Sequence, residues 1–119
     1  MEVLEVASRI ETKIKLLEKG RGQLQELASR RAVKIAQYDC QLGITIIKLR
    51  NGVAMKAGGE TVKDPPATTT EKIAKAICWQ ERLDIEQADT EYKLAVKKLD
   101  CVQAELNGYQ SINRYLDVH

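Results

Sequence analysis

The chain has 119 residues, a formal net charge of +2, 30% charged residues and only 4% aromatic residues. This composition excludes a collagen-like, a disulfide-dense and a low-complexity disordered protein, and no apolar run approaches the roughly 18 residues of a membrane span. The first residues, Met1 to Glu5, lack the basic and apolar regions of a signal peptide, so we expect a cytoplasmic protein with no membrane partner.

The charges are divided unevenly along the chain. Residues 1–56 hold 11 basic and 6 acidic side chains, whereas residues 57–119 hold 8 basic and 11 acidic ones. Because the two halves have opposite net charge, we expect them to pack against each other.

Residues of about 2–50 are predicted to form one long helix with an apolar heptad seam. The first row of the seam is Val3, Ile10, Leu17, Leu24, Arg31, Tyr38 and Thr45, and the second is Ala7, Ile14, Arg21, Ala28, Ile35, Leu42 and Leu49. Gly20 and Gly22 weaken a helix, but the seam continues from Leu17 to Leu24 without a shift of phase. We therefore expect a continuous helix with a weak or bent point at residues 20–22.

Two interpretations compete for residues 44–55. Ile44–Ile47 is a β-favouring run, and Asn51-Gly52 after it could be a two-residue hairpin turn. Alternatively, Gly52 is the left-handed stop of the long helix, which the heptad register favours. A connector of about 51–68 follows, and it could hold a short β-ribbon around Val53–Met55 and Thr61–Lys63.

A second helix is predicted over about 69–107. Thr68 and Glu71 have the spacing of a capping box, and Pro65-Pro66 prevents the helix from starting earlier. Its seam consists of Ala74, Cys78, Ile85, Ala88, Tyr92, Ala95, Leu99, Val102, Leu106 and Tyr109, interrupted by Glu81. Asn107-Gly108 predicts a stop or bend before a short C-terminal helix of about 109–117.

These elements predict an all-α fold, a single domain of residues 1–119 built as a long antiparallel helical hairpin that resembles a coiled coil. Folding about the connector pairs residue i with roughly residue 119 − i, which brings basic side chains of the first helix to acidic ones of the second. The structural ion pairs are expected among Arg30, Arg31, Asp84, Asp89 and Glu91. The second helix has a wider apolar face than a two-stranded seam requires, so we expect a dimer or higher homo-oligomer that forms a multi-helix bundle.

No residues of an active site are found. The three cysteines are widely spaced and His119 is the only imidazole, so neither a metal site nor His-based catalysis is expected. We predict a non-enzymatic protein without a cofactor.

The remaining candidates for function are surfaces. Trp79 is the only Trp, and the tail from Asn107 to Tyr115 is rich in Tyr, Arg and amide side chains. The candidate partner-binding residues are Trp79, Tyr109, Gln110, Asn113, Arg114 and Tyr115. Large aromatic side chains dominate interface hot spots, although packing within a homo-oligomer explains the same residues. The basic first helix gives a less favoured alternative, contact with nucleic acid in replication or recombination. A third is an oligomeric sponge that sequesters nucleotides between protomers.

Two segments carry a resemblance. Ala67-Thr68-Thr69-Thr70-Glu71-Lys72-Ile73-Ala74-Lys75 and Ala104-Glu105-Leu106-Asn107-Gly108-Tyr109-Gln110-Ser111-Ile112-Asn113-Arg114-Tyr115-Leu116 resemble small helical proteins of phages and prophages of Gram-positive bacteria. Such proteins look like early-region accessory products. The resemblance supplies a context, a phage-encoded protein in the host cytoplasm, and no mechanism. Together with the absence of catalytic residues and the wide apolar face of the second helix, it leads to the hypothesis of a protein that binds a host or phage protein, for example to inhibit a host defence factor. The resemblance transfers no functional residues.

Overall fold

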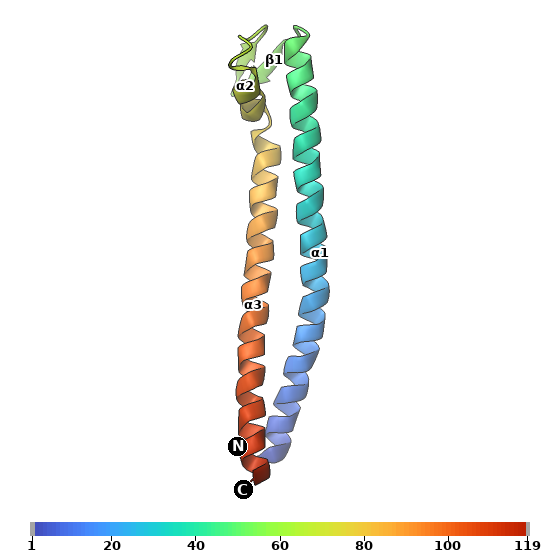
Figure 1. Cartoon of the computed structure of the whole chain (residues 1–119), viewed down its shortest axis with the longest axis vertical. Helices are drawn as coiled ribbons and strands as arrows, with labels where there is room; N and C mark the ends of the chain where they lie inside the picture. Colours follow the sequence, from blue (N-terminus) through green and yellow to red (C-terminus); the bar gives the residue numbers. More distant parts are fainter. Residues whose placement is uncertain (1, 119) are drawn as a thin grey trace. The chain divides into compact units, whose positions relative to one another are not determined.

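The computed structural model describes residues 2–118, and it confirms an all-α fold in which a connector joins two long helices into a hairpin (Figure 1). In chain order the elements are α1 (Val3–Arg50), β1 (Met55–Ala57), β2 (Glu60–Val62), α2 (Thr70–Ile77) and α3 (Trp79–Val118). The chain divides into two compact units: unit 1 contains residues 2–28 and 90–118, and unit 2 contains residues 29–89.

Helix α1 runs without interruption through Gly20 and Gly22, as the continuous seam predicts. The first predicted row of the seam holds the buried side chains of Leu17, Tyr38 and Thr45. Val3 and Arg31 of the same row are exposed, contrary to prediction. The second predicted row is correct at its end, where Leu42 is half-buried and Leu49 is buried. Its first five members are exposed, so the row is wrong there: Ala7, Ile14, Arg21, Ala28 and Ile35.

Over residues 6–41, the second row of α1 lies one residue earlier than predicted. Its members are buried or half-buried: Val6, Lys13, Gly20, Leu27, Lys34 and Gln41. The inner face of a coiled coil is formed by two rows whose members alternate along the chain at steps of three and four residues. The members of this row alternate in that way with Ile10, Leu17 and Leu24 of the first row. Hydrophobicity selects the wrong row because four of the six true positions hold Lys, Gly or Gln, whereas the neighbouring row holds Ile14 and Ile35.

Helix α1 ends at a left-handed glycine. Gly52 has φ 77°, its N–H donates to the carbonyl of Leu49 at 3.2 Å, and the N–H of Val53 donates to that of Lys48 at 3.0 Å. This pair of bonds is a Schellman motif, so the helix-stop interpretation of Gly52 is confirmed and Ile44–Ile47 is helical.

The connector contains a two-stranded antiparallel ribbon in unit 2. Met55 pairs with Val62, and the turn is Gly58-Gly59, whose φ angles of 58° and 85° are both left-handed. Two successive positive φ angles are what a tight hairpin turn requires, and glycine adopts them without steric cost. The first strand therefore begins at Met55, two residues later than predicted.

The predicted capping box does not form. Helix α2 begins at Thr70, and Thr69 in the N-cap position makes no side-chain cap hydrogen bond. The hydroxyls of Thr69 and Thr70 instead donate to the carbonyl of Pro66, at 3.0 and 3.1 Å. Threonine hydroxyls can bond several nearby backbone groups. Here both hydroxyls donate to an upstream carbonyl, and neither caps an N–H group in the first turn of the helix.

The predicted break at Asn107-Gly108 is also wrong, since both residues lie inside α3. The side-chain oxygen of Asn107 accepts a hydrogen bond from Gln103 Nε2 at 3.0 Å, and its backbone carbonyl accepts one from Ser111 Oγ at 3.0 Å. Both contacts join residues one turn apart, so they stabilise the helix at the point where Asn-Gly would otherwise end it. The only interruption between α2 and α3 is at Cys78.

The seam of the second half is placed as predicted. Ala74, Cys78, Ala88 and Leu106 are buried, and the other predicted members are half-buried. The antiparallel register is also close to prediction: Gly20 faces Leu99 in unit 1, and Thr45 Oγ1 lies 3.5 Å from Cys78 Sγ in unit 2.

Candidate interaction surfaces

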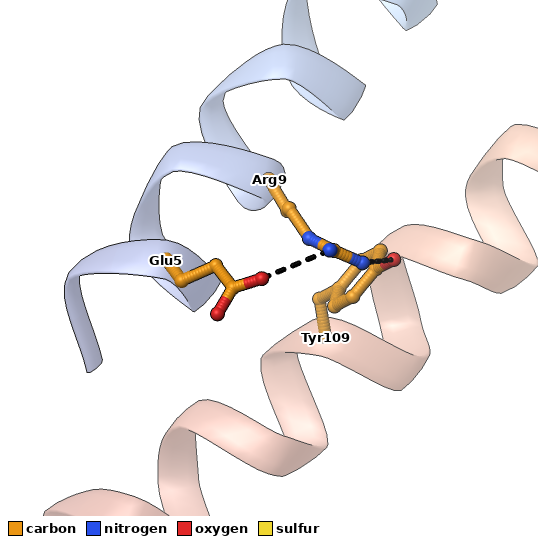
Figure 2. A network of polar contacts seen from close by, with 3 residues as sticks. All are labelled: Glu5, Arg9 and Tyr109. Carbon is orange, nitrogen blue, oxygen red and sulfur yellow. Dashed lines mark hydrogen bonds and ion pairs between the residues drawn. The ribbon is translucent and has the colours of Figure 1, made fainter. Parts of the chain in front are cut away.

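A polar cluster in unit 1 joins α1 to α3 (Figure 2). Arg9 Nη1 donates to the hydroxyl of Tyr109 at 3.0 Å, and Arg9 Nη2 donates to Glu5 Oε1 at 2.9 Å. The guanidinium carbon also lies 5.7 Å from the centroid of the Tyr109 ring. The hydrogen bond to the Tyr109 hydroxyl raises the pKa of Arg9 above its ordinary value. Tyr109, a predicted partner contact, is thus occupied within the chain.

The other predicted residues of the tail are divided between two faces of α3. Asn113 is half-buried on the same side of α3 as Tyr109, four residues away, whereas Gln110 and Arg114 are exposed. Tyr115 is the most exposed aromatic side chain of unit 1, at 63%. The tail therefore does not present one continuous recognition surface.

Among the predicted ion-pair residues, the structure brings Arg31 and Asp89 together in unit 2. Arg31 Nε lies 2.9 Å from Asp89 Oδ1. Asp84 accepts a hydrogen bond from Gln80 Nε2 at 3.4 Å. Arg30 and Glu91 are exposed and belong to different units.

Trp79 lies at the start of α3 with its side chain 60% exposed, although the preceding residue Cys78 is only 1% exposed. Leu83 follows four residues later and is 41% exposed. Residues four apart share one face of a helix, so Trp79 and Leu83 form one apolar patch, here called the Trp79 patch. The ion pair of Arg82 and Glu86, at 3.2 Å, lies next to it in the sequence. The i, i+4 spacing of Trp79 and Leu83 is the signal that could have revealed the patch in the sequence.

A second apolar surface of unit 2 lies on α1 and was missed by the sequence analysis. It consists of the exposed side chains Val33, Ala36, Cys40, Ile44 and Ile47, here called the α1 stripe. The members are three or four residues apart and so follow one face of the helix. A shallow groove runs along its first half, bordered also by Gln37, Gln41 and Glu81.

Unit 1 contains a small pocket of about 140 Å³ between α1 and α3. Its lining is Leu16, Lys19, Gly20, Gln23, Ala95, Lys98, Leu99 and Val102. The pocket lies where α1 has no side chain, at Gly20. Leu99 fills most of the space there, since a Cβ atom added to Gly20 would be 2.3 Å from Leu99 Cδ2.

Comparison with family models, with curated proteins and with solved structures finds no match to this chain. Within residues 2–118, no group of three or more His, Cys, Asp or Glu side chains is arranged to hold a metal ion. Over the same residues, no helix combines the length and apolar character that crossing a membrane requires.

Proposed function

We propose that this protein is a non-enzymatic accessory protein that acts by binding another protein through the Trp79 patch. The main observation in support is that Trp79 is 60% exposed and that Leu83, on the same face of α3, is 41% exposed. Trp is the side chain most enriched in binding hot spots, and an aliphatic neighbour one turn away enlarges the area that a partner can cover. The target is a host or phage protein, in line with the phage-like segments, and inhibition of a host defence factor is the role that we favour.

The charges of α1 support protein binding over contact with nucleic acid. Of the basic side chains that could follow a phosphate backbone, several already have acidic partners. The ion pairs are Arg9–Glu5, Lys13–Glu105, Lys15–Glu11 and Arg31–Asp89. A cation that is already paired releases fewer counterions when it binds DNA, so the electrostatic gain is smaller.

The proposal is tested with the immobilised full chain and lysate of a Gram-positive host, followed by measurement of affinity for the purified captured protein. Trp79→Ala should weaken that affinity by roughly 30-fold or more, because a hot-spot side chain contributes at least about 2 kcal/mol. Leu94→Ala is the matched control, since Leu94 is also 60% exposed but lies in unit 1.

Two results would contradict the proposal. One is equal binding by the wild type, Trp79→Ala and Leu94→Ala. The other is tight binding to DNA that falls steeply with salt and depends on the basic residues of α1.

A further inference from the structure

The second half of α1 has few charges on any face. Residues 2–31 hold twelve charged side chains, whereas residues 32–47 hold only Lys34 and Asp39. Lys34 is half-buried in the inner row, so Asp39 is the one charged side chain outside that row over residues 32–47. A helix that is apolar on more than one face is normally covered on more than one face. In unit 2, the α1 stripe is an uncovered second face: Val33 is 52%, Ile44 is 40% and Ile47 is 60% exposed.

The exposed area of the chain is large enough for an interface with a neighbour. The chain has 8488 Å² of accessible surface. A folded monomer of 13.4 kDa exposes about 6,500 Å². The excess, about 2,000 Å², is larger than the roughly 800 Å² that each partner of a standard interface loses. Covering the α1 stripe would therefore leave the chain with a surface closer to that of an ordinary folded protein.

The sequence of the stripe is complementary to itself. When two copies of a helix pack antiparallel about a two-fold axis at Cys40, Ile47 of one copy faces Val33 of the other, and Ile44 faces Ala36. The second of these contacts places a large side chain on a small one, which lets the two helices interdigitate. Both of these contacts occur twice, and Cys40 meets Cys40 on the axis, as an isologous two-fold interface requires.

We propose that the α1 stripe binds the same stripe of a second copy of this chain, antiparallel about Cys40. The interface pairs the unit 2 part of α1 in one copy with the same part of α1 in the other. It shares no residue with the Trp79 patch, so its tests do not depend on the proposed target.

The first test is the mass of the full chain by light scattering at micromolar concentration, expected to be that of a dimer. Ile47→Glu and Val33→Glu should each raise the dimer dissociation constant at least roughly tenfold, since burying an unpaired charge is unfavourable. Both positions are exposed within the chain, so helicity by circular dichroism should not change. Leu94→Glu, at an equally exposed position of unit 1, should remain dimeric.

The antiparallel register is tested by a double variant. Val33→Lys together with Ile47→Glu places opposite charges at facing positions of the two copies and should restore much of the dimer that Ile47→Glu loses. A parallel pair or a different register would give no such restoration, and that result would overturn the proposed geometry.

Cysteine cross-linking tests the position of the axis. Cys40 and Cys101 are both exposed, whereas Cys78 is buried. A short bis-maleimide should link two copies through Cys40, so Cys40→Ser should abolish the covalent dimer and Cys101→Ser should not. A monomeric wild-type mass, or linkage through Cys101 alone, would overturn the proposal.

Discussion

Gly20 and Gly22 offer a matched pair of substitutions inside α1. Both are helical, but their surroundings differ. A Cβ atom at Gly20 would lie 2.3 Å from Leu99 Cδ2 and 3.3 Å from Leu99 Cγ, whereas a Cβ atom at Gly22 would meet nothing within 4 Å. Replacing each by Ala therefore separates the intrinsic helix preference, which is common to both, from the packing of unit 1, which applies only at Gly20.

The two substitutions should change the free energy of unfolding by different amounts. Ala stabilises a helix interior by about 1 kcal/mol relative to Gly, so Gly22→Ala should raise the free energy of unfolding by about that amount. Gly20→Ala has the same gain, but forcing Leu99 from its place costs about 1–3 kcal/mol. We expect Gly20→Ala to be neutral or to lower the free energy of unfolding by about 2 kcal/mol, which places the two variants about 1–3 kcal/mol apart.

The measurement is urea unfolding followed by circular dichroism, with all variants at one protein concentration because association contributes to stability. Leu99→Ala serves as the second arm of a double-mutant cycle. If Leu99 is the cause, Gly20→Ala should be less harmful in the Leu99→Ala background, with a coupling of at least about 0.5 kcal/mol. Equal stabilisation by Gly20→Ala and Gly22→Ala, or additive effects in the cycle, would refute the reasoning.

The same unfolding assay tests three further features, all in unit 2. Gly52→Ala should destabilise by about 1–2 kcal/mol, because φ 77° is unfavourable for Ala and its Cβ would lie 3.0 Å from Asp64 Oδ1; a smaller loss would mean that the Schellman motif shifts readily. Leu49→Ala should cost about 2–5 kcal/mol, since Leu49 is only 1% exposed, and a loss below 1 kcal/mol would show that its site collapses around Ala. Arg31→Ala should cost no more than about 1 kcal/mol, less at high salt, because the Arg31 side chain is 44% exposed; a larger, salt-independent loss would contradict a screened ion pair with Asp89.

Features that depend on local chain geometry could be predicted from the sequence. The stop of α1 follows from Gly52, because only a residue that tolerates a left-handed backbone fits there. Continuity through Gly20 and Gly22 follows from the unbroken register of Leu17 and Leu24. The inner row that includes Lys13 and Gly20 could not be predicted, since its residues are defined by the facing helix: Lys13 pairs with Glu105, and Gly20 makes room for Leu99.

The candidate surfaces could be predicted only in part, for a similar reason. Trp79 stands out as the only Trp of the chain. The orientation of the Tyr109 side chain depends on Arg9, which lies 100 residues earlier in the sequence and donates a hydrogen bond to the Tyr109 hydroxyl. The β-favouring composition of Ile44–Ile47 directs attention to a possible strand and away from an exposed helix face. β propensity describes how well a side chain fits a half-buried sheet, and it does not decide the structure of a segment within a long heptad pattern.

The inner rows and the α1 stripe have different parts in specifying the helical hairpin of this aromatic-poor chain. Polar side chains in the inner row, such as Lys13 and Lys34, make that row less apolar than a coiled-coil seam usually is. Ion pairs such as Lys13–Glu105 add antiparallel register more reliably than stability. Much of the apolar area of α1 lies instead on the outer side of unit 2, at residues such as Ile44 and Ile47. If two copies cover that area, part of the stability of unit 2 comes from association, so its unfolding midpoint must rise with protein concentration.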